Sequence, residues 1–182
     1  MRMTLTEALG KIKTIDARIE KKKQTVMEHL LRPAALVDPL AASGGQELLV
    51  QGELQAIKDL LEYKLALKTA INQANQVEYL TIMAGPETIT MSIAEWLMWK
   101  RYIAPIRIDL LNNLLRKISN QRDEFVRRMA AQPGQQSLIV NVDEAKLAQQ
   151  LELVVQVFGE MDGQLSLRNS TAFCDVEYQV VE

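Results

Sequence analysis

Apolar residues recur at spacings of three and four over three long stretches, and this periodicity constrains the fold more than any other feature of the sequence. Residues spaced in this way lie on one face of an α-helix, so each stretch predicts an amphipathic helix with an apolar seam. Seams of this length exceed what a short helical hairpin needs, and they predict a defined homo-oligomer. The three seams are Leu5, Ala8, Ile12, Ile15, Ile19, Val26 and Leu30; Leu54, Ile57, Leu61, Leu65 and Ile71; and Leu147, Leu151, Val154, Phe158, Met161 and Leu165.

Local signals set the limits of the helices. Thr4–Glu7 and Ser92–Glu95 have the sequence of capping boxes, in which a hydroxyl and a carboxylate bond the backbone N–H groups at a helix start. Asp143 is the expected cap of the last helix, and Pro105 predicts a kink or a break inside the third. The expected helices run from 5 to about 31, from between 47 and 53 to about 75, from 93 to about 129, and from 144 to about 169.

Three short segments alternate between apolar and polar residues, a pattern typical of β-strands. Residues 77–90 alternate around a Gly85–Pro86 turn and predict a small β-hairpin, and residues 137–142 predict a short strand. Residues 171–181 predict a C-terminal strand. Because a strand needs a partner for its backbone groups, we expect the tail to pair with the hairpin, with the 137–142 strand, or with another copy of the chain. The apolar face of the tail is Cys174, Val176, Tyr178 and Val180.

These elements predict a mainly α fold with small β elements, an α+β chain forming one domain over residues 1–182. Charge alternates along it: residues 1–32 carry a net +4, residues 33–92 a net −4, residues 93–128 a net +4 and residues 143–182 a net −6. The alternation predicts two long antiparallel helical hairpins, each pairing a basic helix with an acidic one. The same order of cap, helix, loop, helix and strand in each half predicts repeat units 4–82 and 92–182. The alternative is a chance likeness between two amphipathic helix pairs.

The rare residues argue against catalysis. His29 is the only histidine, and it lies near a predicted helix end, where a cation suits the helix dipole. Cys174 lies on the apolar face of the predicted tail strand, where a thiol is unreactive. The sequence contains neither a phosphate-binding glycine loop nor a metal-ligand spacing. We therefore expect no enzymatic activity, no cofactor and no bound metal.

The single cysteine excludes an intrachain disulfide and favours a reducing compartment, the cytoplasm. The first residues lack the apolar core of a signal peptide, so none is expected. No apolar run approaches the roughly 18 residues of a membrane span. Hydrophobic residues make up 48% of the chain and charged residues 24%, which is ordinary for a globular protein and excludes a disordered one.

Trp96, Trp99 and Tyr102 form the one concentration of aromatic residues. The two tryptophans are three positions apart and therefore share a helix face. This face favours core packing against the predicted hairpin, with two alternatives. It could anchor a protein interface, where Trp and Tyr are common, or lie at a membrane surface beside Lys100 and Arg101.

Lys21, Lys22 and Lys23 form the strongest basic cluster. Such a cluster suits nucleic-acid binding, a solvated helix face, or pairing with an acidic helix. The sequence pI of about 5.6 and the absence of interleaved aromatic residues favour the last two.

Several motifs occur in a characteristic order: LTEAL with its helix, INQAN at residues 71–75, TIT leading into SIAEWL, and SLIVNVDEAKLAQQLE followed by RNST. In this order they resemble a family of small bacterial and phage proteins, some of them called septicolysin-like, over most of the chain. The resemblance implies a helical bundle with a small β element, and the toxin-like name implies no catalytic residues. The chain departs from the family in having Pro105 inside a helix and a long tail after Asn169.

We therefore expect a non-enzymatic structural or assembly protein, an oligomeric phage-encoded component of a virion or of its assembly. Its expected partners are copies of itself and other assembly proteins, in the host cytoplasm or in the virion. One alternative is a membrane-active, toxin-like protein that uses the Trp96–Tyr102 face. The other is a nucleic-acid-associated protein that uses Lys21–Lys23. Neither a membrane nor nucleic acid is the favoured partner.

Overall fold

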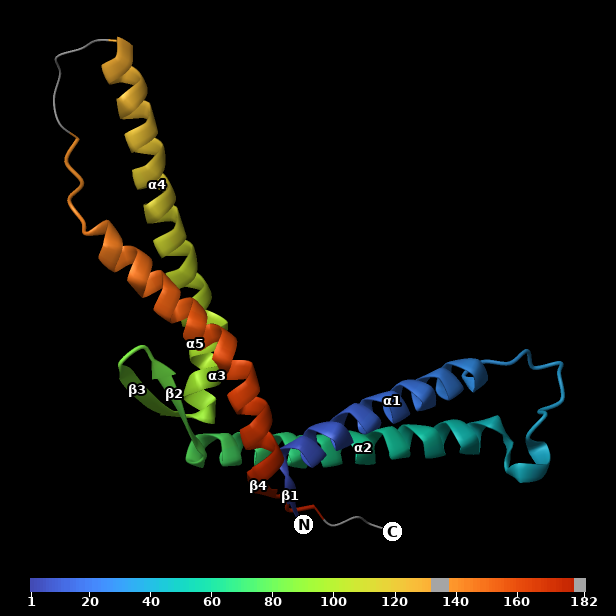
Figure 1. Ribbon diagram of the computed structural model, residues 1–182. Helices are drawn as coiled ribbons and strands as arrows, with labels where there is room; N and C mark the ends of the chain where they lie inside the picture. Colours follow the sequence, from blue (N-terminus) through green and yellow to red (C-terminus); the bar gives the residue numbers. More distant parts are fainter. Residues whose placement is uncertain (132–137, 179–182) are drawn as a thin grey trace. The chain divides into compact units, whose positions relative to one another are not determined.

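The computed structural model describes residues 1–131 and 138–178, and over these residues the chain is mainly helical with two small antiparallel sheets, as the sequence predicts (Figure 1). It divides into two compact units, Met1–Asn75 with Arg168–Glu182, and Gln76–Leu167. The origin of the halves as a repeat stays a prediction, as does the single domain. The elements are β1 (Arg2–Thr4), α1 (Leu5–His29), η1 (Ala41–Ser43), α2 (Gly45–Val77), β2 (Tyr79–Ala84), β3 (Glu87–Ser92), α3 (Ile93–Met98), η2 (Trp99–Ile103), α4 (Ala104–Ala131), α5 (Glu144–Thr171) and β4 (Phe173–Asp175).

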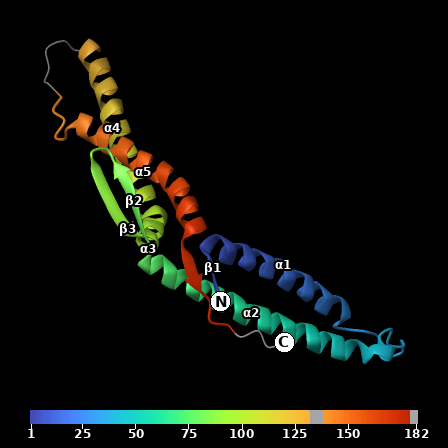
Figure 2. The same cartoon turned by 60° about the horizontal axis from the view of Figure 1, so that its bottom comes forward.

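In the first unit, α1 and α2 lie side by side (Figures 1 and 2). The predicted capping box at Thr4–Glu7 is present: the Glu7 N–H donates to Thr4 Oγ1 at 3.2 Å, and the Thr4 N–H donates to Glu7 Oε2 at 2.8 Å. Lys22 near the end of α1 pairs with Glu53 near the start of α2 at 2.8 Å, and Asp16 pairs with Lys64 further along α2. The two helices are therefore antiparallel, and Lys22–Glu53 joins the basic helix to the acidic one as the charge pattern predicts.

The seam predicted for α2 is wrong at three of its five residues, while Ile71 is buried and Ile57 half-buried. Leu54, Leu61 and Leu65 are exposed, whereas the buried residues of this helix are Leu67, Ala70, Ile71 and Ala74. The helix carries apolar residues on more than one face, and periodicity alone cannot choose which face is covered.

The predicted tail strand is present but short, and its partner is neither of the two expected segments. β4 pairs antiparallel with β1, with Met3 opposite Cys174. The pairing continues one residue further, since the Met1 ammonium donates to the Val176 carbonyl at 2.7 Å and the Val176 N–H donates to the Met1 carbonyl at 2.8 Å. The three residues of β1 are too few to show an alternation, so the sequence contained no signal for this strand.

The second unit begins with the hairpin of β2 and β3, which confirms the prediction for residues 77–90. Leu80 and Ile82 point to the buried side. The turn contains Gly85 at a left-handed φ of +62°, a conformation that glycine adopts without strain. A Cβ at Gly85 would also lie 2.9 Å from Leu153 Cδ2 of α5, so a glycine lets the turn approach that helix.

The helix predicted from residue 93 to 129 is interrupted where Pro105 predicts a break. α3 passes into the π-helical η2, and α4 begins one residue before Pro105. Proline lacks the N–H for an i→i−4 bond and its ring crowds the carbonyl four residues earlier, here that of Arg101. The wider π turn accommodates both effects without ending the helix.

α5 begins after Asp143, whose Oδ1 accepts the Lys146 N–H at 3.1 Å, so the predicted cap is confirmed. The α4–α5 pair is also antiparallel, because Arg122 of α4 lies 2.5 Å from Glu144 and Lys100 of η2 pairs with Asp162. The strand expected at residues 137–142 is wrong over the described residues 138–142, which form no strand. An apolar alternation cannot become a strand without a neighbouring edge to bond.

Candidate functional site

Trp96 is a core residue, which confirms the favoured prediction for it. Its side chain is fully buried, and its indole N–H donates to the Leu80 carbonyl of β2 at 3.0 Å. The capping box of α3 fixes its position, because Ser92 and Glu95 bond each other's backbone N–H groups at 2.8 and 3.2 Å. The Ser92 hydroxyl, followed by the Ser92 N–H, holds the pKa of the Glu95 carboxyl below its ordinary value.

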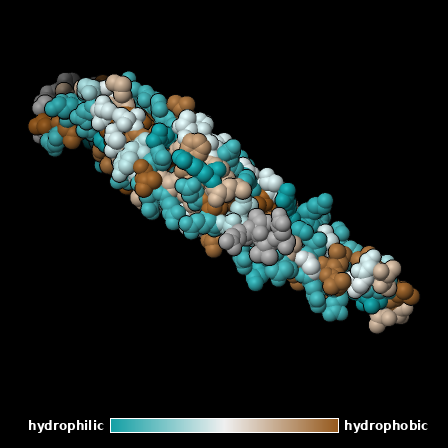
Figure 3. Space-filling view, turned by 90° about the horizontal axis from the view of Figure 1, so that it is seen from below, coloured by the Kyte–Doolittle hydropathy of each residue, from teal (hydrophilic) through white to brown (hydrophobic). Residues whose placement is uncertain are grey.

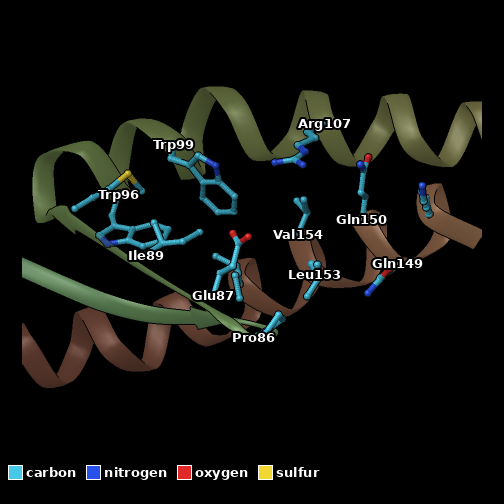
Figure 4. Close-up of a pocket in the computed structure, with 14 residues that line it drawn as sticks. Pro86, Glu87, Ile89, Trp96, Trp99, Arg107, Gln149, Gln150, Leu153 and Val154 are labelled. Carbon is cyan, nitrogen blue, oxygen red and sulfur yellow. The ribbon is translucent and has the colours of Figure 1, made fainter.

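Trp99 packs edge-on against Trp96, with ring centroids 5.6 Å apart and an interplanar angle of 84°. It is half-buried, and it lines a pocket within the second unit (Figure 4). The same pocket is lined by Arg107 of α4, by the tip of the β2–β3 hairpin and by α5. The aromatic pair predicted from spacing therefore has two roles, since Trp96 is a core anchor and Trp99 is the wall of a cavity.

The same helical segment also carries apolar side chains that point to solvent. Five of them lie between 54% and 69% exposed, and four are spaced by four residues, which places them along one face of the helix. The π turn shifts the register by one residue, so Ile103 joins this face. We call this set the outer stripe: Met98, Tyr102, Ile103, Ile106 and Leu110.

Charged groups border the outer stripe. The Arg101 guanidinium lies 5.9 Å above the Tyr102 ring, and Asp109 accepts a hydrogen bond from Asn113 at 2.9 Å. Lys100 pairs with Asp162 and lies 5.4 Å above the ring of Phe158. Phe158, predicted as a seam residue of the last helix, is only half-buried, which corrects that prediction.

The tail residues predicted as an interface lie against the first unit. Cys174 and Val176 are buried, and burial, with Asp175 nearby, raises the pKa of the Cys174 thiol. The Tyr178 hydroxyl donates to the Asp59 carbonyl at 3.1 Å and its ring stacks 4.7 Å from Tyr63, while Val180 lies outside the described residues. Because both side chains are buried, neither Cys174 nor Val176 is accessible to a second molecule in this fold.

The basic cluster is partly paired. Lys22 is half-buried and bonds Glu53 of α2, and Lys23 bonds Glu20 one turn earlier at 3.0 Å. Lys21 is exposed. Two of the three ammonium groups therefore have carboxylate partners. Less positive charge is left to bind the phosphates of a nucleic acid.

His29 ends α1, and its Nδ1 lies 3.1 Å from Gln46 Nε2 at the start of α2. The loop between the helices is held by Asp38, whose carboxylate accepts the N–H groups of Gln46 and Leu40, both at 2.9 Å. These two backbone bonds hold the pKa of Asp38 below its ordinary value, with smaller contributions from Arg32 and His29.

Apolar side chains near this loop are exposed, and brown and tan atoms lie among teal and white ones at the lower right end of Figure 3. An exposed apolar group of this kind is common at protein interfaces. The exposed residues here are Met27, Leu30, Leu31, Leu36, Val37 and Leu48.

The described residues contain no group of three His, Cys, Asp or Glu side chains placed to hold a metal ion. In the same part of the chain, no helix combines the length and apolar character that crossing a membrane requires.

No family model and no curated protein matches the sequence. Among solved structures, the chain is similar to the crystal structure of a functionally unknown conserved protein from Corynebacterium diphtheriae, with a TM-score of 0.52 and 14% sequence identity. The match covers 96% of this chain and 100% of that one. At this identity the similarity shows the fold alone.

Sequence reasoning found Trp96, Trp99 and Tyr102 but missed Arg107 and most of the outer stripe. The spacing of Met98, Tyr102, Ile106 and Leu110 is visible in the sequence, and it indicates an apolar helix face. What the sequence does not reveal is that the other described elements leave this face exposed.

Proposed function

We propose that the protein is a non-enzymatic structural or assembly protein that associates with copies of itself through the outer stripe. The observation that carries the proposal is the exposure of five large apolar side chains in a row on one helix face. Exposed apolar patches on this scale mark interaction sites in folded proteins. Because the opposite face of the same helix packs into the core through Trp96 and Leu111, the stripe needs a separate partner.

A second copy of the chain suits this surface. When two copies of the helix cross antiparallel with the twofold axis midway between Tyr102 and Ile106, Met98 faces Leu110 and Tyr102 faces Ile106 of the other copy. The same register brings Asp109 near Arg101 of the other copy, so the charge pairs at the edge are complementary. The contact is then self-complementary, as a twofold dimer requires.

The setting follows from the family resemblance and is part of the proposal. A septicolysin-like protein of phage origin, acting in a virion or in its assembly, would work through such protein contacts. The cytoplasm suits Cys174, which is a buried free thiol in this fold. A membrane-active role has less support, because Trp96 lies in the core and Trp99 lines a pocket.

Light scattering across a micromolar concentration series tests the proposal. The wild-type chain should form a defined oligomer, and Ile106→Lys should dissociate it by placing a charge in the stripe. Val155→Lys is the matched control, since Val155 is an exposed aliphatic residue of α5 outside the stripe. Asp109→Arg should weaken association, and adding Arg101→Asp should restore it. A strict monomer, or an oligomer that Ile106→Lys leaves unchanged, overturns the proposal.

A further inference from the structure

The pocket beside Trp99 has the size of a small-molecule site. Its cavity volume is about 560 Å³, within the range of roughly 300–1,000 Å³ that ligand pockets occupy. All of its lining residues belong to the second unit, and they come from the β2–β3 hairpin, the α3–η2–α4 helix and α5 (Figure 4).

One part of the pocket is apolar and firmly held. Trp99 is fixed edge-on by Trp96, which is itself anchored through its indole bond to β2. Ile89 of the hairpin and Leu153 and Val154 of α5 complete this wall. A wall with two tryptophan side chains and several branched side chains favours a flat or branched apolar group.

The lining also contains cationic and amide groups. Arg107 reaches from α4 into the space shown in Figure 4, and among the described residues no hydrogen bond or ion pair engages its guanidinium. Gln150 of α5 reaches into the same space. Lys146, one turn earlier, forms a weak ion pair with Asp143, with 3.9 Å between the ammonium nitrogen and the carboxylate oxygen. Glu87 is the one carboxylate in the lining, so the charges of the pocket sum to positive.

We propose that this pocket binds a small amphipathic anion. The aromatic or branched apolar body would lie against Trp99, Ile89 and Val154. The carboxylate or sulfonate head would lie at Arg107, with Gln150 as a second donor. Arginine suits this role because its planar fork matches a carboxylate or sulfonate group and stays charged at all relevant pH values. The proposal is independent of self-association, since the outer stripe occupies a different face of the helix.

The anionic probe is 8-anilinonaphthalene-1-sulfonate, an aromatic sulfonate. Its binding is measured through its own fluorescence and through energy transfer from Trp96 and Trp99, which both line the pocket. N-phenyl-1-naphthylamine is the uncharged probe of similar size. The anionic probe should bind saturably at one site per chain. Arg107→Gln should raise the Kd of the anionic probe about tenfold or more, because one charged hydrogen bond is lost. The Kd of the neutral probe should stay unchanged.

Three further variants make the result decisive. Arg127→Gln makes the same charge change elsewhere on α4 and should leave both Kd values unchanged. Gln150→Phe fills the pocket from an exposed position and should abolish binding of both probes. Ile106→Lys should not affect binding, because it alters only the stripe. The proposal is overturned if the anionic probe shows no saturable binding, or if Arg107→Gln and Arg127→Gln have equal effects. It is also overturned if Gln150→Phe retains binding or if Ile106→Lys loses it.

Discussion

A single hydroxyl and a single carboxylate determine where both tryptophans lie. Ser92 and Glu95 cap α3, and α3 positions Trp96 in the core and Trp99 one turn later at the pocket. The Ser92 side chain is itself buried, so its hydrogen bonds are shielded from competition with water. The pocket therefore depends on two residues that do not line it.

Ser92→Ala should lower the free energy of unfolding of the second unit by about 1 kcal/mol, the usual loss for an N-cap hydroxyl. Urea unfolding followed by tryptophan fluorescence reads this unit alone, because Trp96 and Trp99 are the only tryptophans. Ser119→Ala, at an exposed position inside α4, is the control and should leave the midpoint unchanged or slightly higher. An unchanged midpoint in Ser92→Ala would show that the cap contributes nothing.

Glu95 also predicts a pH dependence. Its pKa is lowered in the fold from the ordinary 4.5, so the ionised form is favoured in the folded state. The stabilisation is therefore complete above the unfolded-state pKa and is lost as the pH falls through the folded-state pKa. Glu95→Gln should be less stable than the wild type at about pH 7, and the difference should vanish in acid. Urea midpoints measured across this range check the sign, and a difference that grows in acid would contradict it.

At the scale of the elements, local chemistry was readable from the sequence and the choice of packing partners was not. Both capping boxes, the Asp143 cap and the interruption at Pro105 depend on neighbouring residues, and all are present. The register of α2 and the partner of β4 depend on residues far along the chain. The outer stripe could be read only in part, since spacing reveals an apolar face but not whether another element covers it.

α5 illustrates the difference in energy between a seam residue and its neighbour. Met161 is fully buried, whereas Phe158 is only half-buried, beneath Lys100. Met161→Ala should cost about 2–5 kcal/mol, because it removes buried area and leaves a cavity. Phe158→Ala should cost less, about 1–2 kcal/mol, because its side chain is only partly buried. Urea unfolding of the two variants gives the ranking directly, and the reverse order would mean that the helix is rotated from this register.

At the scale of the whole molecule, the two ends of the chain complete the same unit. β1 and β4 pair, and the Leu5 N–H at the start of α1 donates to the Ala172 carbonyl at 3.0 Å. Met3, Leu5, Cys174 and Val176 are all buried where the ends meet. The tail is thus part of the core of the first unit.

Deleting residues 173–182 should therefore destabilise the first unit and leave the second intact. Without β4, the backbone groups of β1 lose their partners and Met3 loses its cover. Hydrogen exchange should become faster in peptides from α1 and α2, while the urea midpoint read by tryptophan fluorescence stays the same. Unchanged exchange in α1 would show that the pairing of the ends contributes nothing to this unit.

Cys174 offers a second measure of the same pairing, because it is the only cysteine and it is buried. Its thiol should react with a disulfide reagent only when β4 separates from β1. Met3→Ala, directly opposite Cys174, should speed this labelling, whereas Met83→Ala on the exposed side of β2 should not. Labelling of the native protein at the rate of the urea-unfolded chain would contradict the burial of Cys174.

The pairing of β1 with β4 also affects the order in which the two units can fold during synthesis. A ribosome makes Arg2 first and its partner Asp175 only about 10–35 s later, at roughly 5–20 residues per second. During that interval the nascent first unit lacks the strand that covers Met3, and its apolar start is available to chaperones. The second unit is continuous in sequence and emerges whole before the tail does. The pairing of β1 with β4 therefore forms only after residues 173–175 have left the ribosome, when the second unit has already emerged.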